Sequence, residues 1–235
     1  MMNSRLLASG LLAAAFALSF SGARADELIV NGGFETGDFT GWSTANGGSG
    51  AWFVTSGNSA PDSGEPTVGP ASGNYYAVTG QGGPGSHSLW QDFTVGAGQT
   101  VNVSFDMFDN DFSDAGPLGG NGNLNYSDGA NQHVEVDILD STGSTILDNL
   151  FYGSTPAAGP NPYQAYSFNI SSAVAAGGTY ELRFAEVDNQ FFNSMGVDNV
   201  SVTDSASSVP DATSTLMCLG AALPVLAGLR RRFRR

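Results

Sequence analysis

The chain has 235 residues, with 22 acidic against 8 basic side chains and a formal net charge of −14 at pH 7. A field of that sign repels nucleic acid and anionic membranes, so we expect no nucleic-acid partner. The single cysteine, Cys218, lies near the C-terminus, which excludes disulfides, thiol catalysis and zinc–thiolate sites from the domain before it.

The first 25 residues have the layout of a secretory signal peptide. Met1–Arg5 carries one positive charge, Leu6–Phe20 is apolar, and Ala23-Arg24-Ala25 supplies a small-x-small cleavage pattern. An apolar stretch of this length favours a cleaved signal over a membrane anchor, which is the alternative. We therefore predict export through the inner membrane and a mature chain that starts at Asp26.

Short runs of β-forming residues between glycine-rich turns fill residues 26–208. Val101, Val103, Phe105 and Met107 alternate with more polar neighbours, as in antiparallel strands with one face against a core. We predict one all-β domain, a jelly-roll β-sandwich of about 8–10 antiparallel strands. The expected strands are Leu28–Asn31, Trp52–Thr55, Tyr75–Thr79, Ser88–Val95, Gln99–Phe108, His133–Asp140, Ser144–Phe151, Tyr163–Asn169, Thr179–Val187 and Met195–Val202.

The charge of this domain is more extreme than that of the whole chain. Arg183 is the only lysine or arginine between Asp26 and Ser208. The same segment contains 21 acidic residues, which are the 22 of the chain without Asp211. Two interpretations are open: the carboxylates keep the exported domain soluble, or some of them collect divalent cations.

Both ends of the domain resemble galactose-binding-like and carbohydrate-binding-module jelly rolls. The matching residues are Asn31-Gly32-Gly33-Phe34-Glu35 with Phe39-Thr40-Gly41-Trp42 at the start, and Gly196–Val202 at the end. The resemblance implies a structural calcium that ties the first loop to the last strand, with Glu35 and Asp198 as carboxylate ligands and Asn31 as a weaker candidate. The alternative is a solvated Glu35 and an Asp198 that caps a turn.

A second acidic patch comprises Asp106, Asp109, Asp111 and Asp114. The spacing of Asp109 and Asp111 is that of the opening of a calcium loop, but the glycine and glutamate that an EF-hand needs further on are absent. We interpret the patch as exposed loop carboxylates, followed by a long mobile loop at Pro117–Asp128.

Sugar binding requires aromatic platforms beside amides and carboxylates. Tyr126, Phe191 and Phe192 lie in polar loops, with Asp188 and Asn189 near the phenylalanines, so these five residues are the candidate ligand-binding set. A plain packed loop is the alternative for each of them. The alternation of its strand places Trp90 in the core.

Catalysis has little support in the sequence. Neither His87 nor His133 lies in a nucleophile or metal-ligand motif. Pairs of carboxylates could hydrolyse glycosides, but they arise by chance in so acidic a chain. We therefore expect no enzyme and keep a glycoside-active hydrolase as an alternative.

The C-terminal 27 residues resemble the PEP-CTERM sorting signal of Gram-negative bacteria, in a variant with Val209-Pro210-Asp211 as the motif. An uncharged, largely apolar run of membrane-spanning length follows at 212–229, and the basic tail 230–235 holds five arginines. The resemblance implies an exosortase-type membrane processing enzyme as partner, transient anchoring by a transmembrane helix, and release to the cell surface or extracellular matrix. A buried helix of a soluble domain is the alternative.

Together these features predict an exported, non-catalytic jelly roll that binds extracellular polysaccharide. A calcium-stabilised structural component of the matrix or biofilm, without a specific ligand, is the other hypothesis.

Overall fold

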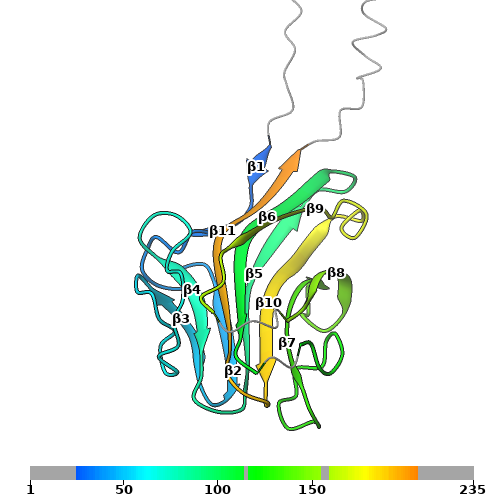
Figure 1. Ribbon diagram of the computed structural model, residues 1–235. Coiled ribbons are helices and arrows are strands. Elements are labelled where there is room, and N and C mark those ends of the chain that lie inside the picture. Colours follow the sequence, from blue (N-terminus) through cyan, green and yellow to red (C-terminus); the bar gives the residue numbers. More distant parts are fainter. Residues whose placement is uncertain (1–24, 114–115, 155–158, 206–235) are drawn as a thin grey trace, which may run out of the picture.

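Two antiparallel sheets face each other in the computed structural model, which describes residues 25–113, 116–154 and 159–205 (Figure 1). Sheet A has the order β3 (Ala51–Thr55), β4 (Tyr76–Gly80), β11 (Asn193–Ser205), β6 (Thr100–Asp111) and β9 (Gln164–Asn169), and β1 (Asp26–Glu27) pairs with the far end of β11. Sheet B has the order β2 (Ser43–Gly48), β5 (Gly85–Val95), β10 (Gly178–Asp188), β7 (Gln132–Asp140) and β8 (Ile146–Gly153).

From β4 onwards the chain crosses between the sheets at every connection except that from β7 to β8. This wiring places strands that are distant in sequence side by side, as in a jelly roll. The predicted all-β sandwich is confirmed, with ten main strands and the two-residue β1. No helix in the described ranges has the length and hydrophobicity of a membrane span. The predicted signal peptide (1–25, all but its last residue), the sorting motif with its apolar run and basic tail (209–235), and Asp114 lie outside the described residues.

Nine of the expected strands form at the predicted places, but the strand predicted at Leu28–Asn31 does not. Leu28 N–H donates to Val202 O (2.8 Å), and then the chain leaves the sheet: Ile29 N–H donates to a Glu27 carboxylate oxygen and Val30 N–H to Gln91 Oε1. Asn31 has a φ of 55°, in the left-handed region and outside the extended conformation of a regular strand. Side-chain acceptors thus replace the ladder partners that a strand would use.

Strand β2 has no sequence signal, because its residues are small and include two glycines. It forms by pairing along β5, from Ser43 opposite Trp90 to Gly48 opposite Gly85. Asn46 fixes its end: the Oδ1 atom accepts Trp52 N–H (3.1 Å) and lies 3.1 Å from His87 Nδ1.

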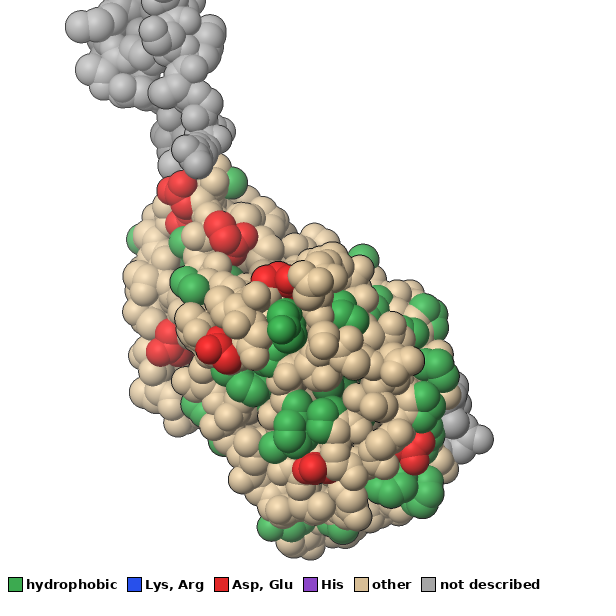
Figure 2. Space-filling view, turned by 90° about the vertical axis from the view of Figure 1, so that its left-hand side faces the viewer, with side chains coloured by type: hydrophobic (Ala, Val, Ile, Leu, Met, Phe, Trp, Pro, Cys, Tyr) green, Lys and Arg blue, Asp and Glu red, His purple; other side chains and the backbone are tan. Residues whose placement is uncertain are grey.

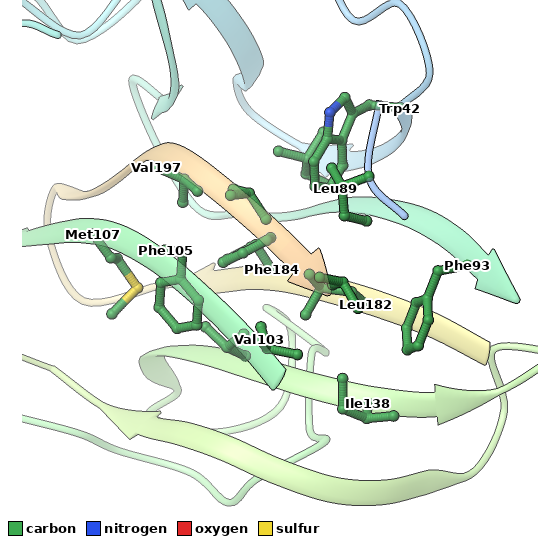
Figure 3. Close-up of a cluster of buried hydrophobic side chains, with 14 of the residues drawn as sticks. Trp42, Leu89, Phe93, Val103, Phe105, Met107, Ile138, Leu182, Phe184 and Val197 are labelled. Carbon is green, nitrogen blue, oxygen red and sulfur yellow. The ribbon is translucent and has the colours of Figure 1, made fainter. Parts of the chain in front are cut away.

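The core lies between the sheets and follows the predicted alternation (Figure 3). Phe105 on β6 meets Phe184 on β10 edge to face, with ring centroids 5.1 Å apart. Phe34 and Trp42 bring the first loop into this core, and Trp42 Nε1–H donates to Asn31 O. At one end of the sandwich lie β1 and the C-terminal end of β11. At the opposite end, called the tip below, lie the loops at 82–84 and 189–192 (Figure 1).

Candidate ligand-binding site

A groove of about 410 Å³ crosses the outer face of sheet B. It is lined by Ala45, Asn46, Gly47, Ser86, Ser88, Leu124, Asn125 and Tyr126. Because His87 and Leu89 point into the sandwich, Ser86 and Ser88 point outward and form its floor. A Cβ atom on Gly47 would lie 3.4 Å from the Tyr126 ring, so the ring stands directly beside β2. We call this hollow the sheet-B groove.

Two asparagines hold the loop that carries Tyr126. The fully buried Asn131 donates through Nδ2 to the carbonyls of Asn123 (2.8 Å) and Asn125 (3.1 Å). Asn189 donates through Nδ2 to the carbonyls of Tyr126 (2.9 Å) and Gly129 (2.7 Å). The loop predicted to be mobile is thus tied by its backbone to the ends of β7 and β10.

A second, smaller hollow of about 260 Å³ lies at the tip of the sandwich, lined by Gly82, Gly83, Pro84, Asn189, Gln190, Phe191 and Phe192. Phe191 is 55% exposed, and its ring centroid lies 4.8 Å from that of Phe192. Three predicted ligand residues, Asn189, Phe191 and Phe192, therefore line this tip pocket, whereas Tyr126 lines the sheet-B groove.

Asp188, the remaining predicted ligand residue, is buried beneath the tip pocket. Its Oδ1 accepts the N–H groups of Gln190 (2.9 Å) and Phe191 (3.2 Å), and its Oδ2 accepts Gln81 Nε2–H (2.6 Å). Burial raises the pKa of Asp188. In this position it shapes the turn that presents the phenylalanines, and it reaches no surface.

Trp90 was expected in the core, and that prediction is wrong. It lies half-buried on the outer face, two residues from Ser88 and opposite both Ser43 of β2 and Arg183 of β10. The inward positions of β5 are Leu89, Gln91 and Phe93, so the apolar tryptophan occupies the outward side of the alternation. It adds an aromatic surface on the face that holds the sheet-B groove.

Arg183 is the only basic residue of the described ranges, and it lies on this same face. Its Nη2 donates to Glu135 (2.6 Å) and to Asp137 (2.8 Å), both fully buried. Burial opposes ionisation of Glu135, but hydrogen bonds from His133 and Gly122 and the charge of Arg183 hold its pKa below the ordinary value. Burial and repulsion by Glu135 raise the pKa of Asp137 to about 6.

The two histidines are interior residues. The His133 ring lies 4.9 Å from the Tyr152 ring, centroid to centroid and tilted by 48°, and its Nδ1 lies 3.0 Å from Leu118 O. His87 contacts Gln81, Asn46 and the carbonyl of Ser49, and burial lowers its pKa to about 4. Within the described ranges neither forms a hydrogen bond with a serine, threonine or cysteine side chain.

Glu35 and Asp198, the expected calcium ligands, converge on the loop at 71–75. Glu35 accepts the N–H groups of Asn74 and Tyr75, and Asp198 accepts those of Ala71 and Ser72. Asp198 is fully buried, and burial together with the nearby Glu35 raises its pKa. Two neighbouring carboxylates suit a divalent cation, but a cation here would compete with these N–H groups for the carboxylate lone pairs.

Asn31, the weaker candidate, shapes the first loop. Its Nδ2 donates to the carbonyls of Asp38 and Thr40, and its Oδ1 accepts Thr36 N–H. Across the described residues, no three acidic, histidine or cysteine side chains gather closely enough to hold a metal ion. Any calcium at this position would therefore need carbonyl or water oxygens beside Glu35 and Asp198.

The acidic patch on β6 differs from its prediction. Asp109 and Asp111 were expected in an exposed loop, but β6 continues to Asp111 and both side chains are buried. The alternation that starts at Val101 carries on and places them on the inward face, while Asp106 lies outward and accepts Asn199 Nδ2–H (2.7 Å). The face of the molecule shown in Figure 2 carries only scattered carboxylates.

No protein-family model and no curated protein matches the chain. Solved structures with a similar arrangement of strands include TmCBM61 in complex with β-1,4-galactotriose (15% identity, 75% of this chain and 97% of that chain, TM-score 0.48). The K3 cleaved adhesin domain of Lys-gingipain from Porphyromonas gingivalis (15%, 77% and 99%, 0.47) and a cyclase from Fischerella sp. TAU (17%, 77% and 98%, 0.45) are others. Likeness at this level concerns the fold alone and assigns no family and no activity.

Proposed function

We propose that this domain binds extracellular polysaccharide through the sheet-B groove. The observation that supports the proposal is the composition of the groove: an aromatic ring beside a floor of serine hydroxyls, with Asn125 on the adjoining loop and no charged residue in the lining. Sugars offer apolar C–H faces that stack on aromatic rings and hydroxyl groups that bond to Ser and Asn. Trp90 extends this surface by one outward position along β5, about 6.6 Å from Ser88.

Replacing Tyr126 or Trp90 with alanine should weaken polysaccharide binding by about tenfold or more, the loss of ~1.4 kcal/mol typical of an aromatic anchor. A glycan array identifies the ligand, and titration calorimetry with that glycan measures each variant. Thr94→Ala is the matched control, because Thr94 is exposed on the same face of β5 but outside the groove. A Phe191→Ala arm reports on the tip pocket. Equal binding by all variants would refute the proposed site.

We treat the domain as non-catalytic. The alternative is a glycoside-active hydrolase. One observation favours it: the pKa values of Glu135 and Asp137 are displaced in opposite directions, as in the carboxylate pairs of glycoside hydrolases. Both carboxylates are fully buried and bound to Arg183, so neither reaches the groove. Release of reducing sugar from the bound glycan, lost in Glu135→Gln, would establish the hydrolase instead. If the array shows no ligand at all, a purely structural matrix component is the better description.

We also propose that a calcium ion binds between Glu35 and Asp198 and links the first loop to the last strand. At a calcium concentration 100-fold above Kd, binding stabilises a domain by about 2.7 kcal/mol. For a domain of this size the melting temperature should rise by about 5–10 °C. Calorimetry of the full-length protein in calcium and in EDTA tests this, with Asp198→Asn expected to lose the part of the shift that comes from this pair. Identical melting curves of the wild type in both buffers would exclude it.

We likewise propose how the protein is exported and sorted, on the basis of the sequences of its N-terminal and C-terminal segments. The signal peptide directs export, and an exosortase-type enzyme recognises Val209-Pro210-Asp211 and releases the domain to the cell surface or extracellular matrix. Mass spectrometry of the secreted protein should find Asp26 at its start and no residues of the 212–235 tail. A secreted chain that keeps its tail would refute the sorting step.

A further inference from the structure

A layer of polar side chains lies inside the sandwich, between the hydrophobic core and the tip. It arises because four inward-facing strands change from apolar to polar residues at the same level. On β10 Leu182 and Phe184 are followed by Glu186 and Asp188, and on β6 Phe105 and Met107 are followed by Asp109 and Asp111. On β11 the inward position is Asn193, directly opposite Asp111, and on β7 it is Gln132, directly opposite Asp188.

The carboxylates of the two sheets face each other across this layer. Burial raises the pKa of Glu186 well above its ordinary value, and the neighbouring Asp188 of β10 and Asp109 of β6 raise it further. All of the acids and amides named above are at least 96% buried. Carboxylates removed from water cost several kcal/mol each unless a cation accompanies them.

Among the described residues, no cationic side chain supplies that charge. Arg183 is on the outer face with Glu135 and Asp137, and His87, opposite Glu186 on β5, is neutral at pH 7 because burial lowers its pKa to about 4. The internal segments outside the described ranges, 114–115 and 155–158, contain no basic residue in the sequence.

Several oxygens of the layer also lack a hydrogen-bond partner. Neither carboxylate oxygen of Glu186 accepts a hydrogen bond of normal geometry, although the Thr79 hydroxyl lies near enough to lower its pKa slightly. Gln132 Oε1 and Asn193 Oδ1 are likewise buried without a partner. These three side chains come from β10, β7 and β11, so unpartnered oxygens enter the layer from both sheets.

We infer that this layer is a second cation site, which takes a divalent ion of the calcium type between the two sheets. Glu186 supplies the carboxylate ligand, Gln132 and Asn193 supply amide oxygens, and Asp109 adds a further negative charge. An all-oxygen set of this kind suits calcium, which accepts six to eight carboxylate, amide and water oxygens, and suits zinc poorly. Because the acids alone do not form a metal-binding group, the amides are required members of the set.

The ion would act on the tip pocket. Asp188, next along the same inward face from Glu186, holds the N–H groups of Gln190 and Phe191. A cation that fixes β10 against β6 and β11 at this level would therefore also fix the turn that presents the two phenylalanines.

The test uses the full-length protein, stripped with EDTA and dialysed against calcium chloride. Bound calcium is counted by atomic emission and the melting temperature is measured. Glu186→Gln keeps the shape of the side chain but removes its charge, so it should bind one calcium fewer than the wild type and lose part of the calcium-induced shift. Glu181→Gln, on the outward face of the same strand, is the matched control and should behave like the wild type.

Asp198→Asn separates this site from the proposed Glu35–Asp198 site. It should keep the ion that Glu186→Gln loses, whichever way the Glu35–Asp198 proposal turns out. If Glu186→Gln does not fold, Asn193→Asp replaces it in the test. Because it adds a carboxylate to the layer, this variant should bind calcium about tenfold more tightly than the wild type and should melt at a lower temperature in EDTA. Equal calcium counts in Glu186→Gln and the wild type, or unchanged affinity in Asn193→Asp, would overturn the inference and leave Glu186 as a protonated acid.

Discussion

Replacing Arg183 with methionine should lower the free energy of unfolding by about 3–5 kcal/mol, the usual loss when one partner of a buried ion pair is removed. The guanidinium is 13% exposed and binds two fully buried carboxylates through Nη2, at 2.6 and 2.8 Å. Without it, Glu135 and Asp137 repel each other inside the sheet-B face. Urea unfolding at pH 7 measures the loss.

The loss should depend on pH in a definite direction. The pKa of Asp137 is raised from 3.8 to about 6, so the folded protein holds this proton more tightly than the unfolded chain. Stability from this group therefore falls as pH rises from about 4 through 6. Removing the arginine raises that pKa further, so Arg183→Met should be less harmful at pH 5 than at pH 8.

Two variants control for the charge. Arg183→Lys keeps the cation but not the planar fork, and should lose part of the stability. In the triple variant Arg183→Met/Glu135→Gln/Asp137→Asn no charge is left unpaired, so most of the loss should be recovered. A loss below ~1 kcal/mol in Arg183→Met would mean that water screens this pair as it screens surface ion pairs.

Replacing Phe105 with alanine should cost about 3–5 kcal/mol, the range for a large aromatic side chain deleted from a core. The ring is 2% exposed and packs against Phe184 on the other sheet, with 5.1 Å between the ring centroids (Figure 3). On its own sheet it stacks on Tyr166 of β9, with 5.2 Å between the centroids. Its removal leaves a cavity where the two sheets meet.

Leu147→Ala is the matched control for this substitution. Leu147 lies on β8 with 40% of its surface exposed, and its truncation should change the free energy of unfolding by about 0.5 kcal/mol or less. Similar values for the two variants, measured by denaturant unfolding with equal slopes, would mean that the sheets do not pack as described.

Much of the fold could be predicted because strand alternation is a local property. The run from Val101 to Met107 specifies which face is apolar, and burial of that face follows whatever the partner sheet is. Strand β2 could not be predicted in this way, since its small residues acquire strand geometry only by pairing with β5. Likewise Asn31 ends the expected first strand through side-chain bonds to carbonyls of a loop that closes only in the folded chain.

The candidate site was predictable only in its residue types. Tyr126, Phe191 and Phe192 were selected as aromatics in polar loops, and they do line hollows. Their separation into a groove and a tip pocket depends on Asn189, whose side-chain amide accepts the backbone N–H of Asn131 and donates to the carbonyl of Tyr126, about 60 positions away. Asp188 has the same local pattern as its neighbours, yet it points inward because β10 extends to that residue.

The sequence by itself determined the all-β sandwich and the excess of carboxylates, because periodicity and composition need no knowledge of distant contacts. Tertiary structure alone decided which carboxylates are buried. From the sequence, Asp109 and Asp111 were predicted to be loop residues. In the structure β6 extends through them and places them between the sheets, across from Glu186 and Asp188 of β10, which lie some 75 positions later in the chain. The energy of a charge depends on what surrounds it, and in a jelly roll those surroundings come from strands far apart in the chain.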